Sequence, residues 1–165
     1  MVPSYGADAS SQSRYTTTMS IDGNLRALFH HHLRRGFHWQ AVETPETGAG
    51  IPDSNFCSEG REGWIEFKKT SGWACPLREG QVAWIHRRVR SGGRVWIATR
   101  RSHTGGPRKG PPVDQLWLVP GRYVIQLRLE GLRSVEGQRD ILITHGGPSM
   151  WYWGVVQQIL QDRVA

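Results

Sequence analysis

A strand, a helix and a second strand follow one another between residues 60 and 99, and this succession limits the fold more than any other feature. In GREGWIEFKKT, apolar residues alternate with Glu66 and Lys68, which is the period of a strand with one face in a core. LREGQVAWIHRRVRSGG then repeats apolar residues at helical spacing and stops at two glycines. RVWIAT follows as a short buried strand. This order predicts a β-α-β core and therefore an α/β fold.

Further elements surround this core. We expect a helix in residues 21–36, a strand in FHWQAVET, and a hairpin in which Gly60 turns the chain between the Asp53 segment and GREGWIEFKKT. A Gly/Pro-rich basic loop separates RVWIAT from a further strand, DQLWLVP. RYVIQLRLEG fits both a strand and a short helix, and we favour the helix. SMWYWGVVQQILQDRV predicts a closing helix.

Length and composition favour one domain. With 165 residues and 38% hydrophobic content, the chain is long enough for one compact core and short for two. Residues 1–19 are rich in small and hydroxylated residues and lack apolar periodicity, so we expect a flexible N-terminal extension. Residues 20–165 are expected to form the single domain.

The chain is strongly basic, with a formal charge of +7 and an isoelectric point near 10.1. Such a charge suits a polyanionic partner better than an acidic small molecule, and nucleic acid is the leading candidate. A basic surface that serves only solubility is the alternative, and charge alone does not separate the two.

The sequence also bears on compartment. Cys57 and Cys75 are the only cysteines and form no recurring CxxC pattern, so we expect reduced thiols. No apolar run approaches the roughly 18 residues of a membrane span, and the N-terminus has no hydrophobic signal core. We therefore expect an intracellular, cytoplasmic protein without a membrane partner. The run His30 to His32 does not imply zinc, because consecutive helical residues face different directions.

Asp53, Glu66 and Lys68 are the candidate chemical groups. A hairpin would return Asp53, which follows a proline, alongside Glu66 on the strand. Two neighbouring carboxylates repel, which raises a pKa unless a cation compensates, and such oxygen ligands suit Mg²⁺. Lys68 could then polarise an attacking water. The alternative is that Glu66 and Lys68 form a solvated pair on a strand face.

Three segments in order, TGAGIPD, GWIEFK and LREGQVAWI, resemble the PD-(D/E)XK nuclease superfamily. They are most similar to its virus-type repair-nuclease (VRR-NUC) and Holliday-junction-resolvase-like branch, which includes small phage-encoded members. The resemblance covers about residues 36–100. It implies a restriction-endonuclease-like core with a central mixed β-sheet flanked by α-helices. It also implies hydrolysis of DNA phosphodiester bonds with Mg²⁺, for which Mn²⁺ substitutes, and a homodimer.

The resemblance assigns roles to individual residues. Asp53 and Glu66 match the metal-binding carboxylates, and Lys68 matches the catalytic lysine. The backbone carbonyl of Phe67 would be a further metal ligand. Gln81 matches a glutamine that supports the site in this branch, and a peripheral polar residue at the start of the helix is the alternative for it.

A third acidic ligand is harder to place. Such nucleases often carry a glutamate in the first helix, where this chain offers only Asp22 and Asn24. Glu43 closes an expected strand just before a glycine turn and could reach the same edge, so we take it as the substitute. Glu46 in the following loop is the alternative, and Glu43 could also be an ordinary strand-end carboxylate.

Cations near these motifs are candidates for phosphate contact, since phosphate contacts supply affinity without much sequence information. The Gly/Pro-rich basic loop is the stronger candidate. The arginines at the end of the Gln81 helix can also serve its dipole. The expected nucleic-acid-binding residues are Lys69, Arg100, Arg101, Arg108 and Lys109.

Together these features predict a Mg²⁺-dependent endodeoxyribonuclease that acts on branched DNA, such as Holliday junctions, or on duplex DNA. Recombination, repair or processing of phage DNA in the host cytoplasm is the setting that the resemblance implies. A nonspecific nuclease, a flap nuclease or a nickase remains open. The competing class is a noncatalytic module that binds nucleic acid or a host protein on the same fold.

Overall fold

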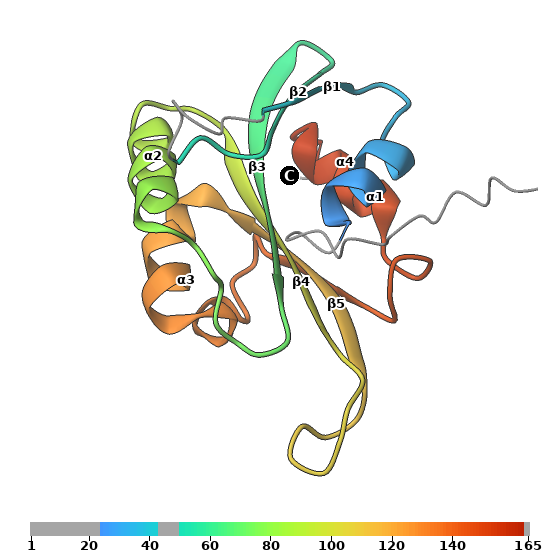
Figure 1. Cartoon of the computed structure of the whole chain (residues 1–165). Helices are drawn as coiled ribbons and strands as arrows, with labels where there is room; N and C mark the ends of the chain where they lie inside the picture. Colours follow the sequence, from blue (N-terminus) through green and yellow to red (C-terminus); the bar gives the residue numbers. More distant parts are fainter. Residues whose placement is uncertain (1–23, 43–49, 164–165) are drawn as a thin grey trace, which may run out of the picture.

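The computed structural model describes residues 24–42 and 50–163. Within these residues six strands form one sheet, in the order β1-β2-β3-β4-β5-β6 (Figure 1). Only β3 and β4 pair in parallel; the other neighbours are antiparallel. The strands are β1 (His38–Ala41), β2 (Ser54–Ser58), β3 (Arg61–Thr70), β4 (Val95–His103), β5 (Val113–Pro120) and β6 (Leu142–His145).

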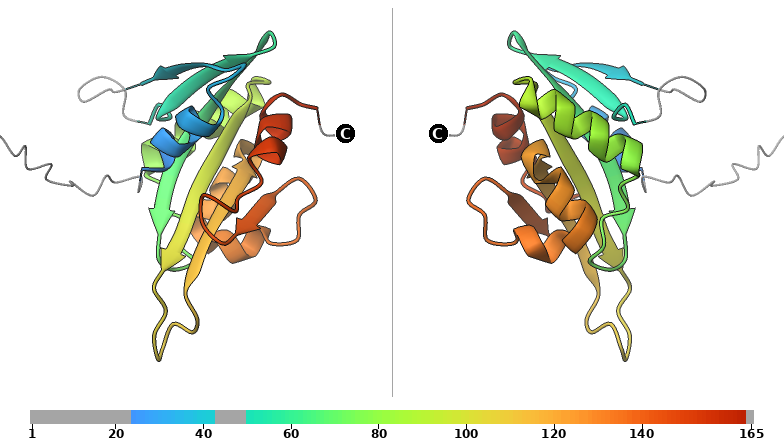
Figure 2. Two further views of the ribbon diagram at one scale, coloured as in Figure 1. Left: turned by 90° about the vertical axis from the view of Figure 1, so that its right-hand side faces the viewer. Right: turned by 90° about the vertical axis from the view of Figure 1, so that its left-hand side faces the viewer.

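Helices cover both faces of the sheet. The helices α1 and α4 lie on one face and α2 and α3 on the other (Figures 1 and 2). The α-helices of the described residues are α1 (Leu25–His32), α2 (Glu79–Arg90), α3 (Val124–Glu130) and α4 (Trp153–Leu160). The expected α/β fold, a central mixed sheet flanked by α-helices, is therefore confirmed. The expected extension, residues 1–19, lies outside the described residues.

Two apolar layers hold the helices to the sheet. On one face Phe29 of α1 and Leu160 of α4 pack with Ile65 and Phe67 of β3. On the other face Ile85 of α2 belongs to a second layer, with buried residues of α3 and of the central strands. The alternation of β3 produces this division, because successive side chains of a strand point to opposite faces. The side chains of Glu66 and Lys68 therefore lie on the face covered by α2 and α3.

The β2–β3 hairpin fixes which residues face each other. Glu59 and Gly60 adopt positive φ angles of 51° and 75°, as a two-residue turn of this handedness requires. Ser54 pairs with Ile65, so Asp53, one residue before β2, lies level with Glu66 on the neighbouring strand. The expected hairpin at Gly60 is confirmed.

The β-α-β core is also confirmed. The chain leaves β3, forms α2 and returns as β4, which runs parallel to β3 with Lys68 opposite Thr99. The helices expected at RYVIQLRLEG and near the C-terminus are present as α3 and α4. Cys57 and Cys75 are free thiols, as expected. None of the described helices has the length and apolar character needed to cross a membrane.

Two features of the sheet differ from the prediction. The strand expected in RVWIAT continues through two arginines to His103, because Arg100 pairs with Asp114 on the neighbouring strand and Arg101 packs over Trp73. The short edge strand β6 was not expected. Four residues are too few for a periodic pattern to distinguish a strand from a loop.

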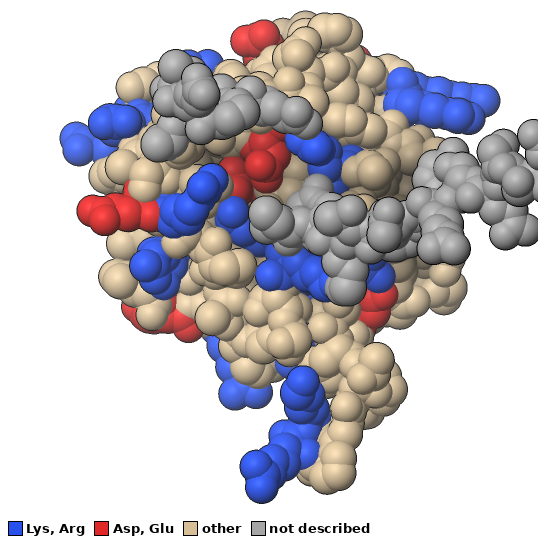
Figure 3. Space-filling view, in the orientation of Figure 1, with Lys and Arg blue, Asp and Glu red and all other residues tan. Residues whose placement is uncertain are grey.

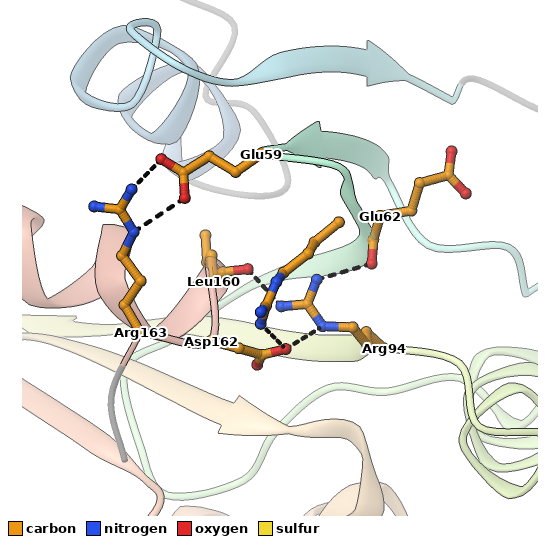
Figure 4. A network of polar contacts seen from close by, with 7 residues as sticks. Glu59, Glu62, Arg94, Leu160, Asp162 and Arg163 are labelled. Carbon is orange, nitrogen blue, oxygen red and sulfur yellow. Dashed lines mark hydrogen bonds and ion pairs between the residues drawn. The ribbon is translucent and has the colours of Figure 1, made fainter.

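An arginine network ties the C-terminal segment to the β2–β3 hairpin (Figure 4). Arg94 donates to the backbone carbonyls of Glu62 and Leu160, and its Nε lies 3.2 Å from Asp162. Its guanidinium also lies over the ring of Trp96. Two further ion pairs, Arg61 with Asp162 and Arg163 with Glu59, complete the network.

Candidate functional site

Four residues expected in the site come together on one side of the sheet. Asp53 precedes β2, Glu66 and Lys68 lie on β3, and Gln81 lies in the first turn of α2. Glu66 is fully buried and forms the centre of the group.

The two oxygens of the Glu66 carboxylate have different surroundings. Oε1 lies 2.6 Å from the Lys68 ammonium and accepts a hydrogen bond from the side-chain amide of Gln81. Oε2 is buried and has no hydrogen-bond partner among the described residues. Leaving a buried carboxylate oxygen without a partner is costly, which makes Oε2 a candidate for binding a cation.

The raised pKa of Glu66 also favours the binding of a cation. Burial raises its pKa to about 7, and the charge of Asp53 contributes in the same direction. The charges of Lys68 and Arg78 oppose the increase. A carboxyl with this pKa gains a strong preference for its ionised form when a further positive charge approaches.

Asp53 is held by the backbone of the strand it faces. Its Oδ2 accepts a hydrogen bond of 2.7 Å from the backbone N–H of Phe67. Phe67 lies just beyond the β2–β3 ladder, which ends at Ile65, and in an extended strand the N–H and the C=O of one residue point to the same edge. The carbonyl of Phe67 therefore faces the side on which Asp53 lies, as the expected role of a backbone ligand requires.

Gln81 is oriented by the start of its own helix. Its side-chain oxygen accepts a hydrogen bond of 3.0 Å from the backbone N–H of Arg78, as in a capping box. The amide nitrogen must then be the group directed at Glu66, which suits a carboxylate that can only accept. Gln81 is buried and its side chain contacts Glu66, so it does not lie at the periphery of the domain.

A close backbone contact positions the Asp53 segment. Gly50, with a φ of 109°, lies against Gly80 so closely that a Cβ would collide with the carbonyl of Gly80. The contact joins the segment leading to Asp53 to the first turn of α2, next to Gln81. Neither these glycines nor Arg78 was among the residues expected in the site from the sequence. Glycines in GAGIPD and REGQ were the available signal, since glycine marks close backbone approaches.

The donor set fits part of a metal site. The carboxylates of Asp53 and Glu66 and the carbonyl of Phe67 are hard oxygen ligands of the kind that Mg²⁺ prefers. Within residues 24–42 and 50–163, no group of three or more His, Cys, Asp or Glu side chains is arranged to hold a metal. Glu43 and Glu46, the candidates for the third carboxylate, lie outside the described residues.

The five residues expected to contact nucleic acid do not lie together on one surface. Lys69 points to the face opposite Lys68, by the alternation of β3. Arg100 forms a bidentate pair with Asp114, and Arg101 is buried over Trp73, a packing that favours a structural role.

Arg108 and Lys109 are exposed in the loop between β4 and β5. Figure 3 shows basic side chains at the tip of this projecting hairpin. In the same view, acidic side chains lie beside basic ones near the centre of the molecule. The basic tip of the hairpin is therefore separate from the group of acidic and basic side chains near the centre.

Fold and site together define an α/β domain in which Asp53, just before β2, lies beside Glu66 and Lys68 on the central strand β3. No family model matches the chain, and a search of curated proteins found no significant match. The function is therefore inferred from the geometry of the site and from the order of the sequence motifs.

Proposed function

We propose that the protein is a metal-dependent DNA endonuclease of the PD-(D/E)XK class. The observation that carries the proposal is the convergence of Asp53, Lys68 and Gln81 on the buried carboxyl group of Glu66, whose Oε2 has no hydrogen-bond partner among the described residues. A solvated surface pair of Glu66 and Lys68 does not account for this arrangement, because Glu66 is fully buried and the side chain of Lys68 is only 12% exposed.

The site is suited to Mg²⁺, with Mn²⁺ as a substitute. Asp53, Glu66 and the carbonyl of Phe67 would hold the ion, and Glu43 is the proposed further ligand. When bound, the ion would supply positive charge that offsets the charge developing on the phosphate oxygens. Burial of Glu66 strengthens this attraction, because interactions between charges are stronger where water is excluded.

Lys68 has a separate role in the proposed reaction. Its ammonium is held at 2.6 Å from Glu66 Oε1, which fixes its position relative to the carboxylates. From there it can donate a hydrogen bond to a water that attacks the phosphorus. The water oxygen bonds to phosphorus and loses a proton, the bond from phosphorus to the 3′ oxygen breaks, and the 3′ oxygen takes up a proton. This leaves a 5′-phosphate and a 3′-hydroxyl, the products that the motif resemblance implies.

Branched DNA such as a four-way junction is the proposed substrate, in recombination, repair or processing of phage DNA within the host cytoplasm. A homodimer is part of this proposal, since a two-fold symmetric pair presents two sites to two strands.

The test compares cleavage of labelled four-way junction, linear duplex and single-stranded DNA, with Mg²⁺ or with EDTA. We expect cuts that require the metal, and a decrease of about 100-fold or more for Lys68→Ala, the scale of a lost proton-transfer or water-orienting group. Junction-selective cutting supports a resolvase, and equal cutting of all substrates indicates a general nuclease. DNA binding without metal-dependent cuts would identify a noncatalytic module instead.

A further inference from the structure

The strands β4 and β5 extend beyond the rest of the sheet as a two-stranded ribbon (Figures 1 and 2). The pairing of β3 with β4 ends at Arg101, and the pairing of β6 with β5 ends at Gln115. Beyond these positions β4 and β5 pair only with each other, as far as His103 and Val113. We name residues 102–113 the basic arm.

The basic arm carries positive charge and no negative charge. Arg108 and Lys109 are exposed at its tip, and the sequence between residues 102 and 113 contains no Asp or Glu. Neither cation forms an ion pair within the described part of the chain. Exposed cations of this kind are available to bind a polyanion.

The tip of the basic arm is braced by hydrogen bonds within its own backbone. Gly106 and Gly110 form an isolated bridge, and the N–H groups of Lys109 and Gly110 donate to the carbonyl of Gly106. Three prolines restrict the backbone of the same loop. A loop that already holds one conformation loses little entropy when it binds a partner.

The position of the basic arm relates it to the candidate site. Lys68 is level with Thr99 on β4, and the ribbon continues four residues beyond Thr99 to His103. Four strand residues span about 13 Å, so the basic tip lies more than about 13 Å beyond Lys68 along the sheet. That length corresponds to about four base pairs of duplex, at roughly 3.4 Å each.

We propose that the basic arm enters the major groove of duplex DNA beside the cleavage position, where Arg108 and Lys109 neutralise phosphates. The inference rests on the proposed function, since it takes DNA as the substrate. A major groove about 12 Å wide admits a two-stranded ribbon without deformation of the duplex, whereas a minor groove about 6 Å wide would have to open. The preferred substrate class is then DNA with a duplex flank longer than about four base pairs.

The experiment measures binding of fluorescent 24-base-pair duplex in EDTA, so that no cleavage is needed. It compares the wild type with Arg108→Ala/Lys109→Ala at 50 mM and 200 mM salt. Two fewer phosphate contacts lower the slope of log K against log salt by about 1.8. The affinity advantage of the wild type should therefore shrink by about 10-fold between the two salt concentrations.

Arg34→Ala/Arg35→Ala is the matched control. It removes two adjacent exposed cations from the segment between α1 and β1. This segment lies beside the β2–β3 hairpin, where β3 begins, because Ser58 donates a hydrogen bond to the carbonyl of Gly36. We expect this variant to keep the wild-type salt slope. An equal change in both double variants, or no change in either, would overturn the proposed role of the basic arm.

Two further substrates test the groove. On a DNA hairpin with a stem of four base pairs and on single-stranded DNA, we expect the wild type and Arg108→Ala/Lys109→Ala to bind alike. A loss on single-stranded DNA as large as on the long duplex would show general attraction to polyanions and contradict groove binding.

The two proposals fail in different ways. Metal-dependent cleavage by a protein whose duplex binding ignores Arg108 and Lys109 overturns the role of the basic arm alone. Duplex binding that depends on the basic arm, in a protein without metal-dependent cleavage, overturns the nuclease proposal alone.

Discussion

Glu66 shows how a single buried side chain can oppose folding. One of its oxygens is satisfied by Lys68 and Gln81, whereas Oε2 is buried without a hydrogen-bond partner among the described residues. A carboxylate in this position opposes folding unless it is protonated or a cation is bound. Natural proteins keep such arrangements mainly where they serve binding or catalysis.

The pH dependence of stability tests this interpretation of Glu66. Its pKa is raised from 4.5 to about 7, so between these values the folded protein binds more protons than the unfolded chain. Stability therefore decreases as the pH rises through this window. In EDTA, Glu66→Gln should remove that contribution, so the Tm of the variant minus that of the wild type should be more positive at pH 8 than at pH 5.

Glu62→Gln provides the comparison, because it changes an exposed carboxylate on the same strand. Its Tm difference from the wild type should stay nearly constant between pH 5 and pH 8. Parallel pH profiles for Glu66→Gln and the wild type would show that Glu66 has an ordinary pKa.

At the level of elements, the site depends on how closely the Asp53 segment approaches α2. Gly50 and Gly80 are in contact through their backbones, and Gln81 follows directly in the helix. The register of the β2–β3 hairpin then sets Asp53 beside Glu66. Two short local features therefore place carboxylates that are 13 residues apart in the sequence.

Gly50→Ala should destabilise the protein and impair the site together. The added Cβ collides with the backbone of Gly80, and a φ of 109° is strained for alanine. We expect a loss of about 2 kcal/mol or more in the free energy of unfolding, measured by urea denaturation. Gly60→Ala is the control, since a Cβ there has open space and only the positive φ of 75° opposes it. Equal losses for both variants would argue against a close contact at Gly50.

The sequence was sufficient for elements with strong periodic patterns. The β3 alternation, the α2 spacing and the glycine turn at Gly60 act locally, so their signals lie within a few residues. The grouping of Asp53, Glu66 and Lys68 followed from these elements, whereas Gln81 was expected from the motif resemblance. The extension of β4 through Arg100 and Arg101 did not, because Asp114 and Trp73 are remote partners that local composition does not reveal.

Across the whole molecule, the arginine network joins the C-terminal segment to the hairpin that leads into the site. Arg94 binds carbonyls from both regions and pairs with Asp162 (Figure 4). Its side chain is 22% exposed, so these contacts are shielded from water to a large extent. The exposed pair of Arg163 and Glu59 is far more open to solvent.

Arg94→Ala should therefore weaken the fold more than Arg163→Ala. Loss of the Arg94 hydrogen bonds and of its contact with Trp96 should cost about 1–3 kcal/mol in the free energy of unfolding. Arg163→Ala should change it little, because exposed ion pairs contribute little. Urea denaturation of both variants measures the difference. A larger effect of Arg163→Ala would show that the ion pair between Arg163 and Glu59 holds the C-terminal segment to the hairpin more strongly than Arg94 does.

The strand order of the sheet is the same as the strand order of the chain. Every strand pairs with its neighbour in sequence, so each new strand finds its partner already synthesised, and only the connection between two successive strands has to close. During synthesis the sheet can grow outward strand by strand, and Asp53, Glu66, Lys68 and Gln81 can assemble once α2 and β4 have emerged. The layer that joins α1 to α4 must wait until α4 has been made. The nascent polypeptide can thus form its site before that layer closes over the opposite face of the sheet.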